Sequence, residues 1–222
     1  MNASEDLLTQ AARTSDARAP ESARDATDDD AETAVRTTGI LPSQELEQLV
    51  RASKEIRASE PIQDDQYQPA SLDLRLGPVA YRIRASFLPG KDATVEKKLE
   101  DLAMHKMDIT NGAVLERGCV YMIPLLERLA LKGRTSAMGN PKSSTGRLDV
   151  FTRLITDNGI EFDRVRERYV GPLYAEVSPR TFSVLVRKGS RLNQIRIRRG
   201  KPPSSDAAMR RPSMKCAAIL LC

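Results

Sequence analysis

Residues 139–147 bring together the side chains that bind phosphate groups. The segment reads Gly139-Asn140-Pro141-Lys142-Ser143-Ser144-Thr145-Gly146-Arg147. Each oxygen of a phosphate chain needs a hydrogen-bond donor, and the whole chain needs a counter-charge, so hydroxyls, backbone N–H groups and two cations in one loop suit it. The alternative is a polar turn between two strands, because Asn-Pro and Ser-Thr-Gly are also common loop sequences.

A single carboxylate, Glu176, is the candidate for proton transfer. It lies in the run Tyr174-Ala175-Glu176-Val177, where strand alternation places its side chain on the face of Tyr174 and opposite Val177. A buried carboxylate accepts a proton more readily than an exposed one, which is what a general acid/base requires. The alternative is a glutamate that faces solvent on one side of a sheet.

A transition-metal site is not expected in this chain. Its cysteines (Cys119, Cys216 and Cys222) have no metal-ligand spacing, and its only histidine is His105, for which we expect a solvated or packing role. An odd number of cysteines without a disulfide framework indicates a reducing compartment, so we expect a cytoplasmic protein.

Composition indicates a soluble globular protein with an anionic partner. Of the 222 residues, 40% are hydrophobic and 29% charged, no apolar run is long enough to span a bilayer, and the N-terminus does not resemble a secretory signal. The net charge is +5, although residues 1–36 hold nine acidic residues against four arginines. The remainder is therefore strongly basic, which suits a nucleotide or a nucleic acid.

The elements that must position these residues are mostly strands. We expect a disordered acidic leader over residues 1–38, a helix from Ser43, as its cap, to Ile56, and a hairpin of residues 71–76 and 79–84 around Gly77-Pro78. A second helix is expected over residues 95–107. Six short strands follow, at residues 119–123, 128–131, 150–155, 173–177, 182–186 and 191–197.

Short strands with closely spaced turns predict a mainly β domain over residues 39–200 with short helical additions. Residues 201–222 do not continue this pattern. We interpret them as a tail or as the stub of a further domain.

Three segments in order resemble the deoxycytidine triphosphate deaminases, relatives of the trimeric dUTPases. They are residues 68–77 (QPASLDLRLG), residues 142–148 (KSSTGRL), and residues 174–177 (YAEV) followed by 188–195 (KGSRLNQI). The resemblance covers roughly residues 41–200 and is greatest to a longer bacterial form, in which a second, related domain follows the first. It implies a dUTPase-like β-barrel or sandwich.

The resemblance also implies a role for individual residues. Glu176 would be the general acid/base, Arg147 would lie beside it and keep it ionised, and Ser143 would position the attacking water. The nucleotide would be bound by the residues that match the family's substrate contacts: Lys142, Ser144, Thr145 and Gly146 on the triphosphate, together with Tyr174, Ala175 and Gln194.

The implied reaction is conversion of dCTP to dUTP and ammonia without zinc, with Mg²⁺ carried by the triphosphate. Homotrimers with sites between neighbouring subunits are implied as well, with no membrane or nucleic-acid partner. One departure concerns the aspartate that the family has near the sugar, before the catalytic hairpin. This chain has Arg164-Val165-Arg166 there, and either Asp163 or Glu167 could take its place.

Three other functions are compatible with the sequence. A dUTPase-type pyrophosphatase would need an aspartate in a Gly-hydrophobic-Asp hairpin, which Asp157-Asn158-Gly159 matches poorly. A nucleic-acid-binding β-barrel could use the cations of residues 191–199, but the chain has only four Phe and five Tyr for base stacking. The third alternative is a domain that binds nucleotide without turning it over.

Overall fold

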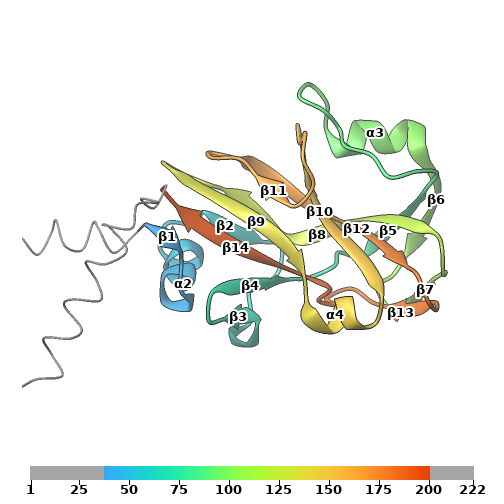
Figure 1. Cartoon of the computed structure of the whole chain (residues 1–222), viewed down its shortest axis with the longest axis horizontal. Coiled ribbons are helices and arrows are strands. Elements are labelled where there is room, and N and C mark those ends of the chain that lie inside the picture. Colours follow the sequence, from blue (N-terminus) through green and yellow to red (C-terminus); the bar gives the residue numbers. More distant parts are fainter. Residues whose placement is uncertain (1–37, 201–222) are drawn as a thin grey trace, which may run out of the picture. The chain divides into compact units, whose positions relative to one another are not determined.

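The computed structural model describes residues 38–200, which form antiparallel β-sheets with short helices (Figure 1). Sheet I has the strand order β11 (Arg164–Val165), β9 (Thr135–Pro141), β14 (Asn193–Arg199), β4 (Ser71–Leu74) and β3 (Tyr67–Gln68), and β1 (Gly39–Ile40) also pairs with β14. Sheet II has the order β10 (Val150–Thr156), β12 (Val170–Pro179), β8 (Val120–Ala130), β5 (Val79–Ile83) and β6 (Ala103–Asp108), and β2 (Ile56–Ala58) pairs with β8. The expected mainly β fold is confirmed.

The remaining elements are short. Strands β7 (Ala113–Leu115) and β13 (Val184–Val186) form a two-stranded sheet. The helices are α2 (Ser43–Arg51), α3 (Val95–Leu102), α4 (Ser143–Arg147) and the 3₁₀ turn η1 (Asp64–Gln66). Within residues 38–200, no helix is long and apolar enough to cross a membrane.

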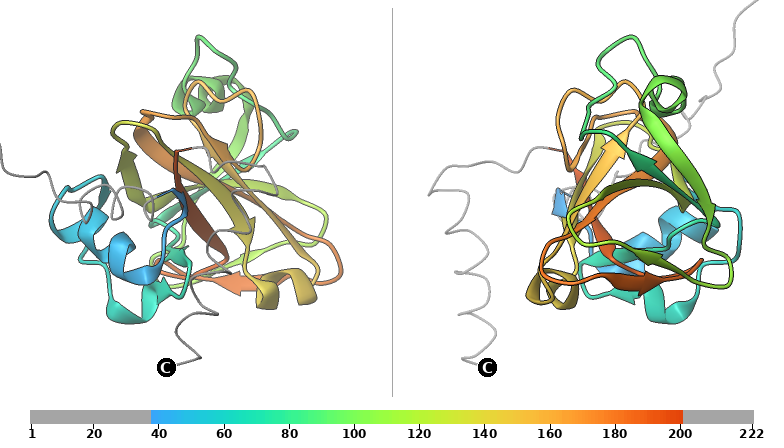
Figure 2. Two further views of the ribbon diagram at one scale, coloured as in Figure 1. Left: turned by 60° about the vertical axis from the view of Figure 1, so that its left-hand side comes forward. Right: turned by 90° about the vertical axis from the view of Figure 1, so that its right-hand side faces the viewer.

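Two apolar clusters lie on opposite faces of sheet II. The main core takes residues from both sheets, among them Leu72 and Ile195 of sheet I and Ala175 and Val177 of β12. The second cluster joins Tyr174 to residues of β5, β8, β10 and α3, which are Ile83, Met122, Ile155, Val95 and Leu99. The views of Figure 2 show α3 at the edge of the sheets that is remote from α2. The predicted alternation of Tyr174 and Val177 is thereby confirmed, since each packs in a different cluster.

The first predicted helix is shorter than expected, and its cap was assigned wrongly. Helix α2 ends at Arg51, and Ile56 belongs to β2, where it pairs with Leu129 of β8. Pro42 precedes the first helical turn, and Ser43 is the first helical residue. Burial of Ile56 against the sheet therefore decides its conformation, although its spacing fits a helix.

The hairpin predicted around Gly77-Pro78 is wrong. Strand β4 pairs with β14 and β3 in sheet I, whereas β5 pairs with β8 and β6 in sheet II, so residues 75–78 carry the chain from one sheet to the other. Gly77 makes this crossing possible, because a Cβ atom there would lie 2.6 Å from the carbonyl oxygen of Pro124. The N–H of Gly77 donates to that same oxygen at 2.8 Å.

Residues 119–123 and 128–131 were predicted as two strands, but β8 is a single strand that includes Pro124, the first residue between them. On one side β8 pairs with β5 through residues 120–122 and with β2 through residues 127–129, so no ladder bond on that side requires the N–H that proline lacks. On the other side the register of β12 shifts between Pro172 and Tyr174.

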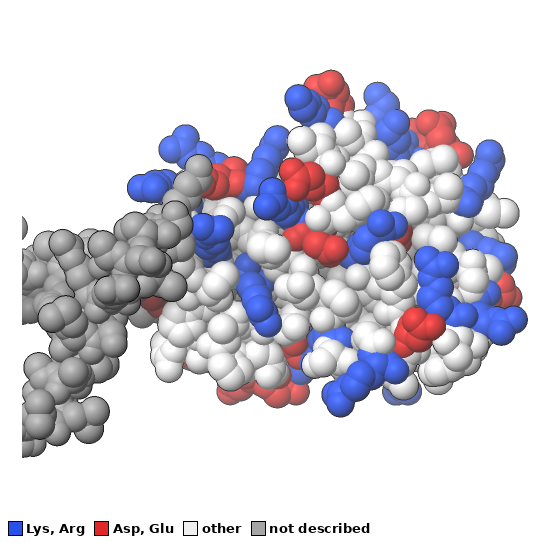
Figure 3. Space-filling model, viewed as in Figure 1, with Lys and Arg blue, Asp and Glu red and all other residues white. Residues whose placement is uncertain are grey.

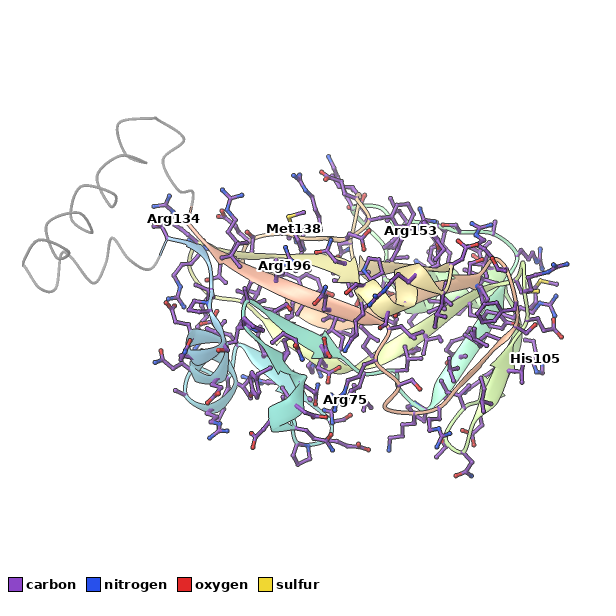
Figure 4. The ribbon with its side chains drawn as sticks, turned by 60° about the horizontal axis from the view of Figure 1, so that its bottom comes forward. Arg75, His105, Arg134, Met138, Arg153 and Arg196 are labelled. Carbon is purple, nitrogen blue, oxygen red and sulfur yellow. The ribbon has the colours of Figure 1, made fainter. Side chains whose placement is uncertain are left out.

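The second predicted helix, over residues 95–107, is also shorter than expected. Helix α3 ends at Leu102, strand β6 follows it, and His105 is an exposed residue of that strand (Figure 4).

A buried ion pair fixes the crossing between the sheets. The Nε of Arg75 donates to Oε1 of Glu127 at 2.8 Å, and its other nitrogens donate to the backbone oxygens of Pro61 and Glu60. Glu127 also accepts from the backbone N–H of Arg75 and from Gln66. The network joins β4, β8 and η1, so it holds the segment that leads from residues 68–74 into sheet II.

The predicted acidic leader, residues 1–38, lies outside the described residues except for Thr38. The predicted tail, residues 201–222, lies outside them entirely.

Candidate active site

The cationic segment 139–147 is not the open loop that its sequence predicts. Gly139, Asn140 and Pro141 end strand β9, and residues 143–147 form one turn of helix, α4. The N–H of Gly146 donates to the carbonyl oxygen of Lys142 at 3.0 Å. Tertiary packing explains the strand, because β9 lies between β14 and β11 and Gly139 packs directly on Leu154.

The hydroxyls and the glycine of α4 face solvent, with one exception. Ser143, Ser144, Gly146 and Arg147 are exposed, whereas Thr145 is buried. The Nε of Arg147 donates to the carbonyl oxygen of Ser143 at 3.3 Å. Within residues 38–200, Arg147 forms no hydrogen bond or ion pair with Glu176, so one chain does not pair the predicted arginine with the predicted glutamate.

Lys142 forms an ion pair with Asp73 of β4. Asp73 is only 1% exposed, and its Oδ1 has no hydrogen-bond partner among residues 38–200. The pair joins two segments that the sequence singled out separately, residues 68–77 and 142–148.

Gln194 lies beside the same pair. In β14 it is opposite Asp73 of β4 on one side and Asn140 of β9 on the other. Its Oε1 accepts from the hydroxyl of Ser71 at 2.9 Å. Sheet I therefore places Gln194 next to Lys142 and Asp73, as one polar group at the end of β9.

Glu176 is buried in the middle of sheet II. It is 1% exposed, and its Oε1 accepts from Nε of Arg153 at 3.0 Å and from Nη2 at 2.5 Å. Its Oε2 is buried and has no hydrogen-bond partner among the described residues. The alternative of a solvent-facing glutamate is therefore wrong.

Arg153 is the partner of Glu176 that sequence reasoning missed. It lies on β10 directly opposite Glu176 of β12. Its guanidinium stacks on the rings of Phe162, at 3.7 Å, and Phe151, at 4.8 Å, and donates to Ser86 at 2.7 Å. Both strands are predictable from the sequence, but the register between them is not, because residues 157–169 connect them irregularly.

Asp163 completes this group of charges. It has a left-handed backbone (φ 61°), and its Oδ1 accepts from the N–H of Leu154 at 2.7 Å. Burial raises the pKa of the Asp163 carboxyl; the bond from Leu154 and the charge of Arg153 lower it, and the charge of Glu176 raises it. Asp163 therefore lies within electrostatic reach of Arg153 and Glu176, whereas Glu167 is exposed between β11 and β12.

A cavity of about 430 Å³ brings α4 next to this group. Gly146, Arg153, Asp163, Phe151 and Arg180 are among its lining residues. Ser144 and Thr145 line a different cavity of about 380 Å³, together with the apolar side chains of Phe182 and Leu185. The end of α4 and the partner of Glu176 thus share one cavity, while the middle of α4 faces another.

Tyr174 and Ala175 flank the glutamate but have buried side chains. Ala175 packs in the main core and Tyr174 in the second cluster, where burial raises the pKa of the phenol. Among the described residues, packing therefore occupies both side chains.

The positive charge of residues 191–199 is partly neutralised by ion pairs. Arg191 pairs with Asp65 at 2.8 Å, and Arg199 pairs with Glu45 at 3.0 Å. Arg196 is exposed and lies opposite Met138 of β9 (Figure 4). Lysines and arginines are spread over the face shown in Figure 3, with acidic side chains between them. This interspersed pattern differs from the continuous basic stripe of a nucleic-acid groove.

Within residues 38–200, no group of three or more His, Cys, Asp or Glu side chains could hold a metal ion. Glu176 and Asp73 are both buried carboxylates of this part of the chain, each 1% exposed.

Comparison with known proteins gives a consistent result. The model of the N-terminal domain of 2'-deoxycytidine 5'-triphosphate deaminases matches residues 37–201. The crystal structure of 2'-deoxycytidine 5'-triphosphate deaminase from Agrobacterium tumefaciens is 56% identical with a TM-score of 0.72, over 74% of this chain and 49% of that chain. The chain thus spans about half the length of that protein.

Native dUTPase of EIAV matches 44% of this chain and 76% of its own, at 14% identity and a TM-score of 0.34, which is too low to support an argument. No curated protein sequence matches the chain at a significant level.

Proposed function

The chain belongs to the 2'-deoxycytidine 5'-triphosphate deaminase family through its N-terminal domain, and on this premise we propose that it deaminates dCTP to dUTP and ammonia. The observation that carries the proposal is the carboxylate of Glu176, which is buried with one oxygen left without a partner. The lone pairs of an oxygen without a partner are free to accept a proton from water, which is what a general base requires.

In the proposed reaction Glu176 activates the attacking water. It accepts a proton from water as the water oxygen attacks C4 of cytosine, and it delivers that proton to N3. It then moves the proton of the new hydroxyl to the amino group. The bond between C4 and the amino nitrogen breaks, ammonia departs, and C4 becomes the carbonyl carbon of uracil. Atoms and charge balance with water as the only co-reactant.

The substrate contacts follow the family resemblance. Lys142, Ser144, Thr145 and Gly146 would bind the triphosphate, and Ser143 would hold the attacking water. Tyr174, Ala175 and Gln194 would contact the rest of the nucleotide. Mg²⁺ would arrive on the triphosphate as part of the substrate. Of the two candidates for the sugar, we propose Asp163, because it lines the same cavity as Arg153 and Gly146.

We further propose that the working site lies between subunits of a homotrimer in the cytoplasm. Two features support a shared site: Arg147, Ser143 and Ser144 are exposed, and Arg147 forms no hydrogen bond or ion pair with Glu176 of its own chain. Arg147 would then act beside a glutamate of a neighbouring subunit.

An ammonia-release assay with dCTP tests the function. The full chain is expected to release ammonia and form dUTP, and Glu176→Gln should lose at least about 100-fold in kcat while still binding dCTP, since general acid/base catalysis contributes about that much or more. Release of pyrophosphate instead would indicate a dUTPase-type reaction. Stabilisation by dCTP without turnover of any cytidine nucleotide would indicate a binding domain and refute the proposed catalysis.

A further inference from the structure

We propose that Arg153 is the positioning residue of Glu176, and that it gives the two carboxylate oxygens different roles. Arg153 holds the carboxylate through Oε1, which leaves Oε2 as the oxygen that exchanges protons with water and the pyrimidine. The inference rests on the proposed deaminase function, because it names the residue that prepares the same glutamate for it.

The hydrogen bonds around Glu176 are unevenly distributed. Oε1 takes both donors of Arg153, Nε at 3.0 Å and Nη2 at 2.5 Å. Oε2 is buried and has no hydrogen-bond partner within residues 38–200. A buried polar atom without a partner destabilises a protein, more so when it carries charge. A hydrogen bond from a water molecule or a ligand would satisfy this atom.

The guanidinium of Arg153 is itself held on several sides. Cζ of Arg153 lies 3.7 Å from the centre of the Phe162 ring and 4.8 Å from the centre of the Phe151 ring. Nη2 also donates to the hydroxyl of Ser86 at 2.7 Å. A planar fork can stack and donate two bonds at the same time, which a lysine ammonium cannot do. The rings and the cross-strand register therefore fix Arg153, and Arg153 fixes Glu176.

The position of Arg153 relates this pair to substrate. Arg153 lines the cavity of about 430 Å³ together with Gly146 of α4 and with Asp163. A nucleotide whose phosphates lie along α4 would bring its other end toward Arg153. Arg153 would then hold Oε2 of Glu176 in one orientation when the pyrimidine binds, so no rotation of the glutamate side chain is required before water is activated.

The test compares Arg153→Ala and Arg153→Lys with Arg82→Ala in the full chain. Arg82 is the matched control, because it lies on the same sheet but pairs with Glu116 at the surface, at 3.0 Å. Arg153→Ala is expected to lose about 100-fold in kcat for ammonia release from dCTP, with KM changed only a few-fold. Millimolar guanidinium should raise the kcat of Arg153→Ala by at least about tenfold. The kcat of Arg153→Lys should lie between those of Arg153→Ala and the wild type, and the kcat of Arg82→Ala should equal that of the wild type.

Two results would overturn the inference. One is Arg153→Ala retaining kcat within twofold. The other is a folded Arg153→Ala, with a wild-type circular dichroism spectrum, whose lost activity guanidinium does not restore. A crystal structure of Arg153→Ala decides the matter even if the wild type proves inactive. We expect Glu176 to leave its present rotamer or become disordered, and an unmoved carboxylate would refute positioning by Arg153 whether or not the chain is a deaminase.

Discussion

Lys142 forms an ion pair with Asp73, a residue almost completely excluded from solvent. The lysine that the sequence suggests for phosphate binding is therefore also the counter-charge of a buried carboxylate. We expect Lys142→Met to lower the free energy of unfolding by about 3–5 kcal/mol, because it leaves the charge of Asp73 without compensation. Urea denaturation measures this change.

The double variant Lys142→Met/Asp73→Asn separates the two roles of the lysine. It should recover most of the lost stability, because no charge then remains buried. If Lys142 also binds the triphosphate, the stable double variant will still bind dCTP more weakly than the wild type by calorimetry. Unchanged affinity would restrict Lys142 to its structural role.

The two glycines of segment 139–147 are predicted to respond in opposite ways to alanine. A Cβ atom at Gly139 would lie 2.5 Å from Cβ of Leu154, whereas a Cβ at Gly146 would have no atom within 4 Å. Gly139→Ala should cost about 1–3 kcal/mol of stability through overpacking. Gly146→Ala should be neutral or stabilising by up to about 1 kcal/mol, since alanine is the better helix former. Thermal unfolding of both variants checks this, and a destabilised Gly146→Ala would contradict the open position of that residue.

Gly146→Ala also tests the proposed phosphate contact. Because the fold tolerates the added methyl group, weaker dCTP binding at unchanged stability would mean that the triphosphate approaches the backbone closely at this residue. Deoxycytidine, which has no phosphates, is the control ligand, and its binding should not change.

The ion pair of Arg75 and Glu127 should dominate the electrostatic part of the stability. The side chains are 5% and 0% exposed, so Glu127→Gln leaves a buried guanidinium without its counter-charge. We expect a loss of about 3–5 kcal/mol in urea unfolding. The exposed pair of Arg82 and Glu116 is the comparison, and Glu116→Gln should cost at most about 1 kcal/mol. Equal losses for the two variants would refute the importance of burial.

Within sheet II the sequence predicts β5, β10 and β12, because their residues alternate or form apolar runs that reflect burial. The strand pattern around Glu176 placed Tyr174 and Val177 on opposite faces, and the packing confirms this. It did not predict that residues 71–74 and 79–83 lie in different sheets, because alternation reveals faces and not partners. Pro124 shows the same limit, since only the pairing around it explains a proline within a strand.

For the candidate site, residue types were predictable and contacts were not. Lys142, Gln194 and Glu176 stand out by type and position in the chain, but the pairs Lys142–Asp73 and Arg153–Glu176 depend on register between strands far apart in sequence. An arginine in an alternating strand is ordinarily read as a solvated side chain. Only its position opposite a buried carboxylate identifies Arg153 as a partner.

Asp163 should make the protein less stable as the pH rises. Because burial raises its pKa in the folded state, the folded protein keeps a proton on this carboxyl that the unfolded chain has already lost. Stability therefore falls as the pH rises from the ordinary value of 3.8 through the higher folded value. Asp163→Asn removes this titration and suits the left-handed backbone, since asparagine adopts it readily. The urea concentration at the unfolding midpoint, measured between pH 3 and pH 7, should increase for the variant relative to the wild type as the pH rises.

Asp108 provides a control of opposite sign. Its pKa is lowered, chiefly by hydrogen bonds from Thr110, so its contribution to stability is present above the ordinary value of 3.8 and is lost as the pH falls through the lower folded value. Asp108→Asn should therefore lose stability relative to the wild type as the pH rises toward the ordinary value of 3.8, whereas Asp163→Asn should gain relative stability as the pH rises above 3.8. Parallel curves for the two variants would mean that burial of Asp163 among Arg153, Glu176 and Leu154 does not control its ionisation.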